Sequence, residues 1–131
     1  LGMTILVHSE HASDADLVAD GVKRAASLEE LLAMSQIISL HGVPGKTPVL
    51  DAARLAQLRK DAILINTARG TLVDEDALAA VLRSGSIAAA GLDVFSSEPL
   101  PLDSPLLDCP NLVLTPHIGG TGVEALERTA L

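Results

Sequence analysis

The stretch from Ile63 to Thr71 constrains the fold of this chain more than any other part of its sequence. It opens with an apolar run that is too short for a helix, and it leads to Arg69 between Ala68 and Gly70. We interpret it as a buried strand that delivers one cation to its end. Four further apolar runs also end in polar or ionisable residues; they lie around Ile5, Ile38, Ala89 and Val113. The simplest explanation is a parallel sheet whose carboxyl ends share one edge, and we predict the functional site there.

Helices are predicted between these strands. Ser27 followed by Glu30 forms a capping box. Asp51 and Asp74 are suited to cap two further helices, and Gly85 stands where a left-handed residue ends the second of them. We expect strands over residues 4–7, 22–24, 36–40, 62–66, 87–94 and 112–114. We expect a short helix before residue 20, helices that end near residues 34, 58 and 85, and one from about residue 121 to the last residue. This alternation indicates an α/β fold, with a parallel sheet covered by helices on both faces.

Charge and composition exclude several classes of function. The formal net charge is -8 and the nine Lys and Arg residues are dispersed, which disfavours a nucleic-acid partner. No stretch approaches 18 uninterrupted apolar residues, and no basic start precedes an apolar signal core, so we expect no membrane segment. The single cysteine, Cys109, cannot form an internal disulfide. These features are typical of a soluble protein of the reducing cytoplasm.

Three ionisable residues follow three different predicted strands and are the main candidates for chemistry. The guanidinium of Arg69 is a planar fork that suits a carboxylate or a phosphate; the alternative is an arginine that joins the strand end to a neighbouring helix. His117 lies in a rigid turn between Pro116 and a pair of glycines, where it either donates a proton or caps the turn. Glu98, on the preceding loop, either pairs with His117 or is solvated. Together they supply an anion clamp, a charge partner and a proton donor.

Other polar residues at strand ends have weaker functional signals. Asp93 ends the fourth main strand, and its partner is either a backbone donor of the next loop or an amide on a ligand. Asn66 is expected to tie down the loop that carries the arginine. His41 either reaches a ligand or bonds its own glycine-rich loop. Residues 8–11 resemble a loose metal set without a second cluster, and we predict no metal.

Three ordered motifs together resemble the D-isomer-specific 2-hydroxyacid dehydrogenases. They are Leu-Ile-Asn-Thr-Ala-Arg-Gly at 64–70, Gly-Leu-Asp-Val-Phe at 91–95 with Glu98-Pro99, and Thr-Pro-His-Ile-Gly-Gly at 115–120. The similarity takes in residues 39–41 and 72–75 as well. It implies a partial Rossmann-type doubly wound domain, in which residues 1–131 are the later part of an NAD(P)-binding domain that is truncated at both ends.

The resemblance also implies roles for individual residues. Arg69 would bind the carboxylate and carbonyl of the substrate, His117 would be the acid/base, and Glu98 would hold His117 protonated for ketone reduction. Asp93 and the carbonyl of Ala68 would hold the nicotinamide carboxamide. The full set of expected cofactor-binding residues is Ser9, His41, Gly42, Val43, Thr67, Ala68, Arg69, Asp93, His117 and Gly119.

The family's glycine fingerprint for pyrophosphate is not found in these residues. By resemblance, that turn and its strand would lie just before Leu1, and the domain that closes over the substrate would lie outside the chain. Ser9 stands where NAD enzymes of this kind usually carry Asp, with Glu10 next to it and no nearby Arg. The cofactor is therefore NAD or NADP, with a slight preference for NAD.

The parent protein is expected to be an NAD(P)-dependent enzyme that interconverts a 2-oxo acid and a D-2-hydroxy acid, as a homodimer. The chain by itself is expected to be inactive. One alternative is a sensing or corepressor-like protein that binds the dinucleotide without turnover. Another is a complete non-enzymatic module of these 131 residues.

Overall fold

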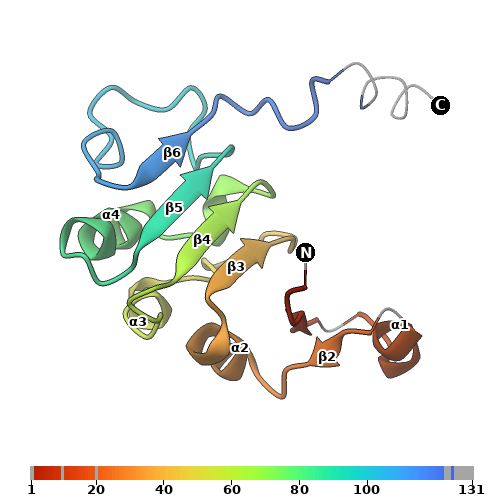
Figure 1. Cartoon of the computed structure of the whole chain (residues 1–131). Helices are drawn as coiled ribbons and strands as arrows, with labels where there is room; N and C mark the ends of the chain where they lie inside the picture. Colours follow the sequence, from red (N-terminus) through yellow and green to blue (C-terminus); the bar gives the residue numbers. More distant parts are fainter. Residues whose placement is uncertain (1, 10, 20, 123–124, 126–131) are drawn as a thin grey trace.

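The computed structural model describes residues 2–9, 11–19, 21–122 and 125. Its strands are β1 (Leu6–Val7), β2 (Lys23–Arg24), β3 (Ile37–Leu40), β4 (Ile63–Asn66), β5 (Ala89–Leu92) and β6 (Leu112–Leu114). Its α-helices are α1 (Asp14–Ala19), α2 (Leu28–Met34), α3 (Ala52–Leu55) and α4 (Glu75–Arg83), and a 3-10 helix, η1, covers Gly70–Leu72. Strands and helices alternate along much of the chain, as predicted (Figure 1).

Parallel strands form the main sheet, in the order β3, β4, β5, β6. The last residue of β4, Asn66, pairs with Leu40 of β3 on one side and with Leu92 of β5 on the other. Leu92 in turn pairs with Leu114, the last residue of β6. The carboxyl ends therefore lie level along one edge, which Figure 1 shows as a row of arrowheads. The predicted common edge is confirmed for these strands.

The first apolar run does not join the main sheet in the described part of the chain. β1 pairs instead with β2, in parallel, in a separate two-stranded sheet. The expectation of one sheet for all the runs is therefore wrong for the run around Ile5. The reason is local pairing: the crossover through α1 brings β2 beside β1, where Lys23 N–H donates to the carbonyl of Ile5 at 3.0 Å and Ala25 N–H to that of Val7 at 2.8 Å. These bonds satisfy backbone groups of β1 on that side.

The core lies on one face of the main sheet, because side chains alternate along each strand. The buried cluster joins alternate strand residues to residues of α2, α3 and α4: Ile38, Leu40, Leu64, Ala90, Leu92, Leu32, Leu55, Leu78 and Leu82. On the other face Ile37 is 52% and Val113 66% exposed. Helices were expected on both faces, but α2, α3 and α4 join this one core in the described residues. Right-handed crossovers that advance in one direction across a sheet place their helices on the same face.

The predicted helix starts are confirmed. The hydroxyl of Ser27 accepts from the N–H of Glu30 at 3.1 Å. The side chains of Asp51 and Asp74 accept from N–H groups in the first turns of their helices, at 2.9 and 3.0 Å. Gly85 follows α4 with a φ of 68°. α3 ends before the expected residue 58, and the helix expected from residue 121 falls mainly outside the described residues. No helix in the described ranges is long and apolar enough to cross a membrane.

Candidate active site

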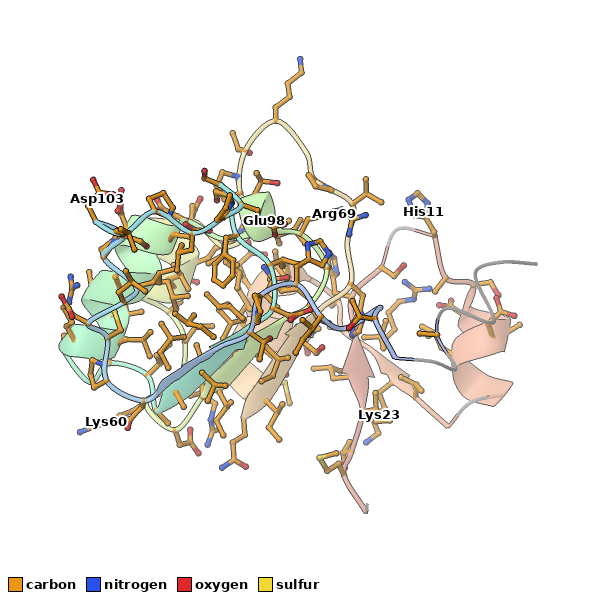
Figure 2. All side chains as sticks on the ribbon, turned by 90° about the horizontal axis from the view of Figure 1, so that it is seen from above. His11, Lys23, Lys60, Arg69, Glu98 and Asp103 are labelled. Carbon is orange, nitrogen blue, oxygen red and sulfur yellow. The ribbon has the colours of Figure 1, made fainter. Side chains whose placement is uncertain are left out.

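Three residues singled out in the sequence meet at the carboxyl edge of the main sheet. Arg69 follows β4, Glu98 lies on the connection after β5, and His117 follows β6. They share a cavity of about 290 Å³. Its lining consists of Arg69, Gly70, Thr71, Phe95, Ser96, Glu98 and His117. Figure 2 shows Arg69 and Glu98 near each other, while Lys60 lies far from both.

A buried amide holds the backbone that carries the arginine. Asn66 is 1% exposed; its Nδ2 donates to the carbonyl of Arg69 at 2.9 Å, and its Oδ1 accepts from the N–H of Ala68 at 3.1 Å. The expectation that Asn66 ties down this loop is confirmed. The exposed guanidinium donates to the carbonyl of Ala68 at 2.6 Å. Within the described ranges Arg69 forms no ion pair and no bridge to a helix, so its charge is available to an anion.

Gly70 allows the loops after β4 and β5 to touch. A Cβ atom at this position would lie 1.9 Å from the carbonyl carbon of Phe95 and 2.3 Å from the nitrogen of Ser96. No side chain fits in that space, because real Cβ atoms do not approach backbone atoms so closely. The contact fixes the loop of Arg69 against the segment that leads to Glu98.

Glu98 and His117 are hydrogen-bonded to each other. Nδ1 of His117 lies 2.8 Å from Oε2 of Glu98, and the other carboxylate oxygen accepts from the N–H of Phe95 at 3.0 Å. The hydrogen bond from His117, followed by that from Phe95, lowers the pKa of Glu98 below its ordinary value. The carboxylate therefore keeps its charge and holds the proton of the imidazole on Nδ1. Nε2 is left as the ring nitrogen for proton transfer.

Asp93 holds the turn that carries the histidine. It is 6% exposed, and it accepts from the hydroxyl of Thr115 and from the N–H groups of Ile118 and Gly119, the latter two at 2.9 and 2.8 Å. These bonds, that of Thr115 first and that of Ile118 next, lower the pKa of Asp93. Of the two partners left open by the sequence, the structure shows backbone donors of the next loop. The turn places His117 at a φ of 55°, in the left-handed region.

Sequence reasoning missed Thr115 as a partner of this aspartate. The signal was present in the register: Leu92 and Leu114 are paired, so the residues that follow them, Asp93 and Thr115, leave neighbouring strands at the same level. Gly119 also has a reason to be glycine, because a Cβ there would lie 3.0 Å from Oδ2 of Asp93. The turn is thus built around one carboxylate.

Replacing Asp93 with asparagine is expected to loosen the turn. An amide NH2 in place of one oxygen cannot accept from a backbone N–H, and losing a hydrogen bond to a charged group costs about 2 kcal/mol. We expect the free energy of unfolding at neutral pH, measured by urea denaturation with far-UV circular dichroism, to fall by that amount. The Asp103→Asn variant, an exposed acid on the preceding connection, is the control and should match wild type.

The same variant tests the pH dependence of stability. Because the folded-state pKa of Asp93 is lowered, its stabilising contribution is fully present above the unfolded-state pKa and is lost as the pH falls through the folded-state pKa. The stability difference between wild type and Asp93→Asn should therefore shrink in that acid range. A difference that stays constant there, or no difference at neutral pH, would contradict this role of the carboxylate.

The other residues expected to contact the cofactor are not in the lining of the cavity. The hydroxyl of Ser9 accepts from two N–H groups of the turn after β1, at 3.1 and 3.2 Å. Nε2 of His41 lies 2.9 Å from the hydroxyl of Ser39 on β3, instead of bonding its own loop. Val43 is 88% exposed. The residues outside the lining are Ser9, His41, Gly42, Val43, Thr67, Ala68, Asp93 and Gly119.

A metal site has no support in the described ranges, which contain no group of three or more His, Cys, Asp or Glu residues that could hold an ion. His8 and His11 belong to the loose set considered in the sequence. The third member, Glu10, lies outside the described residues.

Comparisons with known proteins identify the same family that the three sequence motifs resemble. The family model described as D-isomer specific 2-hydroxyacid dehydrogenase, NAD binding domain, matches residues 1–119. D-3-phosphoglycerate dehydrogenase of Haemophilus influenzae is 48% identical over 112 residues, which cover 81% of this chain and 27% of that protein. (S)-sulfolactate dehydrogenase of Chromohalobacter salexigens is 43% identical over 131 residues, which cover 98% of this chain and 42% of that protein.

The solved structure of apo D-mandelate dehydrogenase of Rhodotorula graminis is similar in fold. It matches with a TM-score of 0.89 at 34% identity, over 99% of this chain and 38% of that one. The resemblance drawn from the three motifs and the Rossmann-type fold are thereby confirmed. The chain spans between 27% and 42% of the length of these proteins.

Proposed function

Because the chain belongs to the D-isomer-specific 2-hydroxyacid dehydrogenase family, whose members are NAD-dependent enzymes, we propose that residues 1–131 are part of the NAD(P)-binding domain of such an oxidoreductase. The whole protein would interconvert a 2-oxo acid and a D-2-hydroxy acid. The relatives named above carry small hydroxy acids in their names, which supports a small-molecule substrate of this class.

One observation carries the proposal: a paired histidine and an unpaired arginine face the same cavity. The His117 imidazole is bonded to Glu98 through Nδ1 at 2.8 Å, so Nε2 is the proton donor. Arg69 has no carboxylate partner in the described part of the chain, and its fork matches the carboxylate of a 2-oxo acid. These are the two charges that the reduction of such an acid requires.

The residues present fit a nicotinamide cofactor. A carboxylate offers about four acceptor positions, and Asp93 uses three of them within the chain. The remaining one can accept from the nicotinamide carboxamide. The carbonyl of Ala68, which accepts from Arg69 at 2.6 Å, likewise keeps a second lone pair. We propose Ser9, His41, Gly42, Val43, Thr67 and Gly119 as further cofactor contacts, outside the cavity.

The reduction needs one hydride and one proton. Asp93 and the carbonyl of Ala68 would hold the nicotinamide of NADH or NADPH, which when bound would supply the hydride. Arg69 orients the substrate through its carboxylate. As the new C–H bond forms, Nε2 of His117 gives its proton to the carbonyl oxygen, and the product is the 2-hydroxy acid. Glu98 stabilises the imidazolium before the transfer and keeps the ring oriented.

The setting and assembly of the whole protein are part of the proposal. The single Cys109 and the dispersed basic residues support a reducing, cytoplasmic setting and a small molecule in place of nucleic acid or membrane. A homodimer is proposed by resemblance to the family. The preference for NAD over NADP rests on Glu10, which lies outside the described residues.

The full-length protein tests the function directly. It should oxidise NADH or NADPH in the presence of at least one 2-oxo acid from a panel of glyoxylate, hydroxypyruvate and pyruvate. Because the chain has no Trp or Tyr, cofactor binding to it is best followed by the fluorescence of the reduced nicotinamide. Tight binding without oxidation by any acid would contradict the proposal and favour the sensing or corepressor-like alternative.

A further inference from the structure

Two carboxylates accept hydrogen bonds from backbone N–H groups of the segment after β5. The N–H of Phe95 donates to Oε1 of Glu98 at 3.0 Å. The N–H of the next residue, Ser96, donates to Oε1 of Glu75 at 2.6 Å. Oε2 of Glu98 in turn meets Nδ1 of His117 at 2.8 Å. A short line of contacts therefore connects Glu75, through the backbone of this segment, to the proton donor.

Glu75 is available for this contact because its helix is capped by another residue. It is the first residue of α4, and the preceding Asp74 caps that helix by accepting from the N–H of Ala77 at 3.0 Å. Glu75 is half-buried, whereas its neighbour Asp76 is exposed. Both acids suit the first turn of a helix, but Glu75 reaches a residue 21 positions further along the chain.

Glu75 does not line the cavity of Arg69 and His117. It lines a neighbouring cavity of about 530 Å³, which shares Thr71 and Ser96 with the first. Ser96 is thus a common wall between the two. An effect of Glu75 on the chemistry would pass through the backbone of Ser96 and not through direct contact with the substrate.

The segment after β5 is also in close contact with the backbone of Gly70. A Cβ at Gly70 would lie 2.3 Å from the nitrogen of Ser96, so the backbone of the loop after β4 is already in close contact there. The hydrogen bond from Ser96 to Glu75 is a second contact at the same backbone nitrogen. A segment held in this way places the Glu98 carboxylate within a narrow range of positions.

We propose that Glu75 is a positioning residue of the active site, which holds the Ser96 peptide so that Glu98 stays in hydrogen-bond contact with His117. Its effect on catalysis rests on the proposed function. Its effect on the Glu98 carboxylate rests on the contacts alone. An experiment that measures both effects can therefore test the role of Glu75 separately from the proposed function.

Three variants of the full-length protein separate the effect of the position of the Glu75 acceptor oxygen from the effect of its negative charge. Glu75→Asp keeps the negative charge at the start of α4 but shortens the side chain by one methylene, so the acceptor no longer reaches Ser96. Glu75→Gln keeps the length and one accepting oxygen while it removes the charge. Asp76→Ala removes the neighbouring exposed acid and is the matched control. All three substitutions are compatible with the helix.

The readouts are kcat, the KM for the cofactor, and the pKa of Glu98 measured by carbon-13 NMR. In Glu75→Asp we expect kcat to fall about tenfold with the cofactor KM unchanged. We also expect the pKa of Glu98, which its bonds to His117 and Phe95 lower, to rise toward its ordinary value. Glu75→Gln and Asp76→Ala should stay near wild type in every readout.

Two outcomes would overturn the inference. Wild-type kcat and an unchanged pKa of Glu98 in Glu75→Asp would show that the contact does not position the carboxylate. An equal loss in Glu75→Asp and Glu75→Gln would show that an intact glutamate, and not the placement of its acceptor, is what matters. If the wild-type protein reduces no 2-oxo acid, the proposed function fails, and the pKa of Glu98 in the same variants still decides the role of Glu75.

Discussion

Replacing His117 with asparagine is expected to lower kcat/KM for 2-oxo acid reduction by the full-length protein about a thousandfold, because a positioned general acid contributes about that much. Asparagine keeps a polar side chain that can still donate to Glu98, but it has no Nε2 that carries a proton. The measurement is the initial rate of NADH or NADPH oxidation at saturating cofactor.

The control for this variant is His11→Asn. His11 is an exposed histidine on the side of the molecule near α1, away from the main sheet (Figure 2), and its replacement should leave kcat/KM at the wild-type value. Retention of wild-type rates in His117→Asn would remove the histidine from the chemistry and with it the assignment of the cavity.

Replacing Arg69 with alanine is expected to raise the KM for the 2-oxo acid about a hundredfold. The loss of a charged, bidentate contact to the substrate carboxylate is worth about 3 kcal/mol, and each 1.4 kcal/mol is about tenfold in affinity. Arg69→Lys should recover only part of this, because an ammonium keeps the charge but not the planar fork. Steady-state kinetics with the acid as varied substrate gives both values.

A matched control is Arg59→Ala, since Arg59 is an exposed arginine whose ion pair with Asp61 at 2.8 Å lies outside the cavity. Its substrate KM should equal that of wild type. An unchanged KM in Arg69→Ala would mean that the guanidinium does not bind the acid, and the carboxylate would need another partner.

The position of the candidate site could be predicted from the sequence because its signals are local. A short apolar run that ends in a polar residue indicates a strand end, and parallel strands bring such ends to one edge. Arg69, Glu98 and His117 each follow a different strand, and they converge because the sheet is parallel and β4, β5 and β6 are neighbours in it. The helix starts at Ser27, Asp51 and Asp74 were equally local, since each cap bonds within three residues.

The contacts that hold the site in place could not be found in this way. The bonds of Asp93 to Thr115 and of Glu75 to Ser96 join residues 22 and 21 positions apart. They depend on strand register and on the start of a helix, neither of which a local pattern specifies. The bond between His41 and Ser39 could have been predicted, because His41 directly follows the strand of Ser39 and residues two apart along an extended chain point to the same side.

The pairing of the strands outside the main sheet also could not be predicted from a local sequence pattern. An apolar run predicts a strand but not the partner that it pairs with, and β1 pairs with β2 instead of joining β3 in the described residues. Likewise, alternating strands and helices predict crossover connections, but they do not predict on which face of the sheet each crossover helix lies. The order β3, β4, β5, β6 advances in one direction, and this order decides that α3 and α4 share a face.

One labelling experiment tests whether the protein transfers a hydride to a 2-oxo acid. The full-length protein would be given a 2-oxo acid and NADH or NADPH carrying deuterium at the transferable position of the nicotinamide. We expect a 2-hydroxy acid of D configuration with one deuterium at C2, formed by wild type and lost in His117→Asn. A protein that binds the cofactor but yields no product, or yields a product without deuterium at C2, would contradict it.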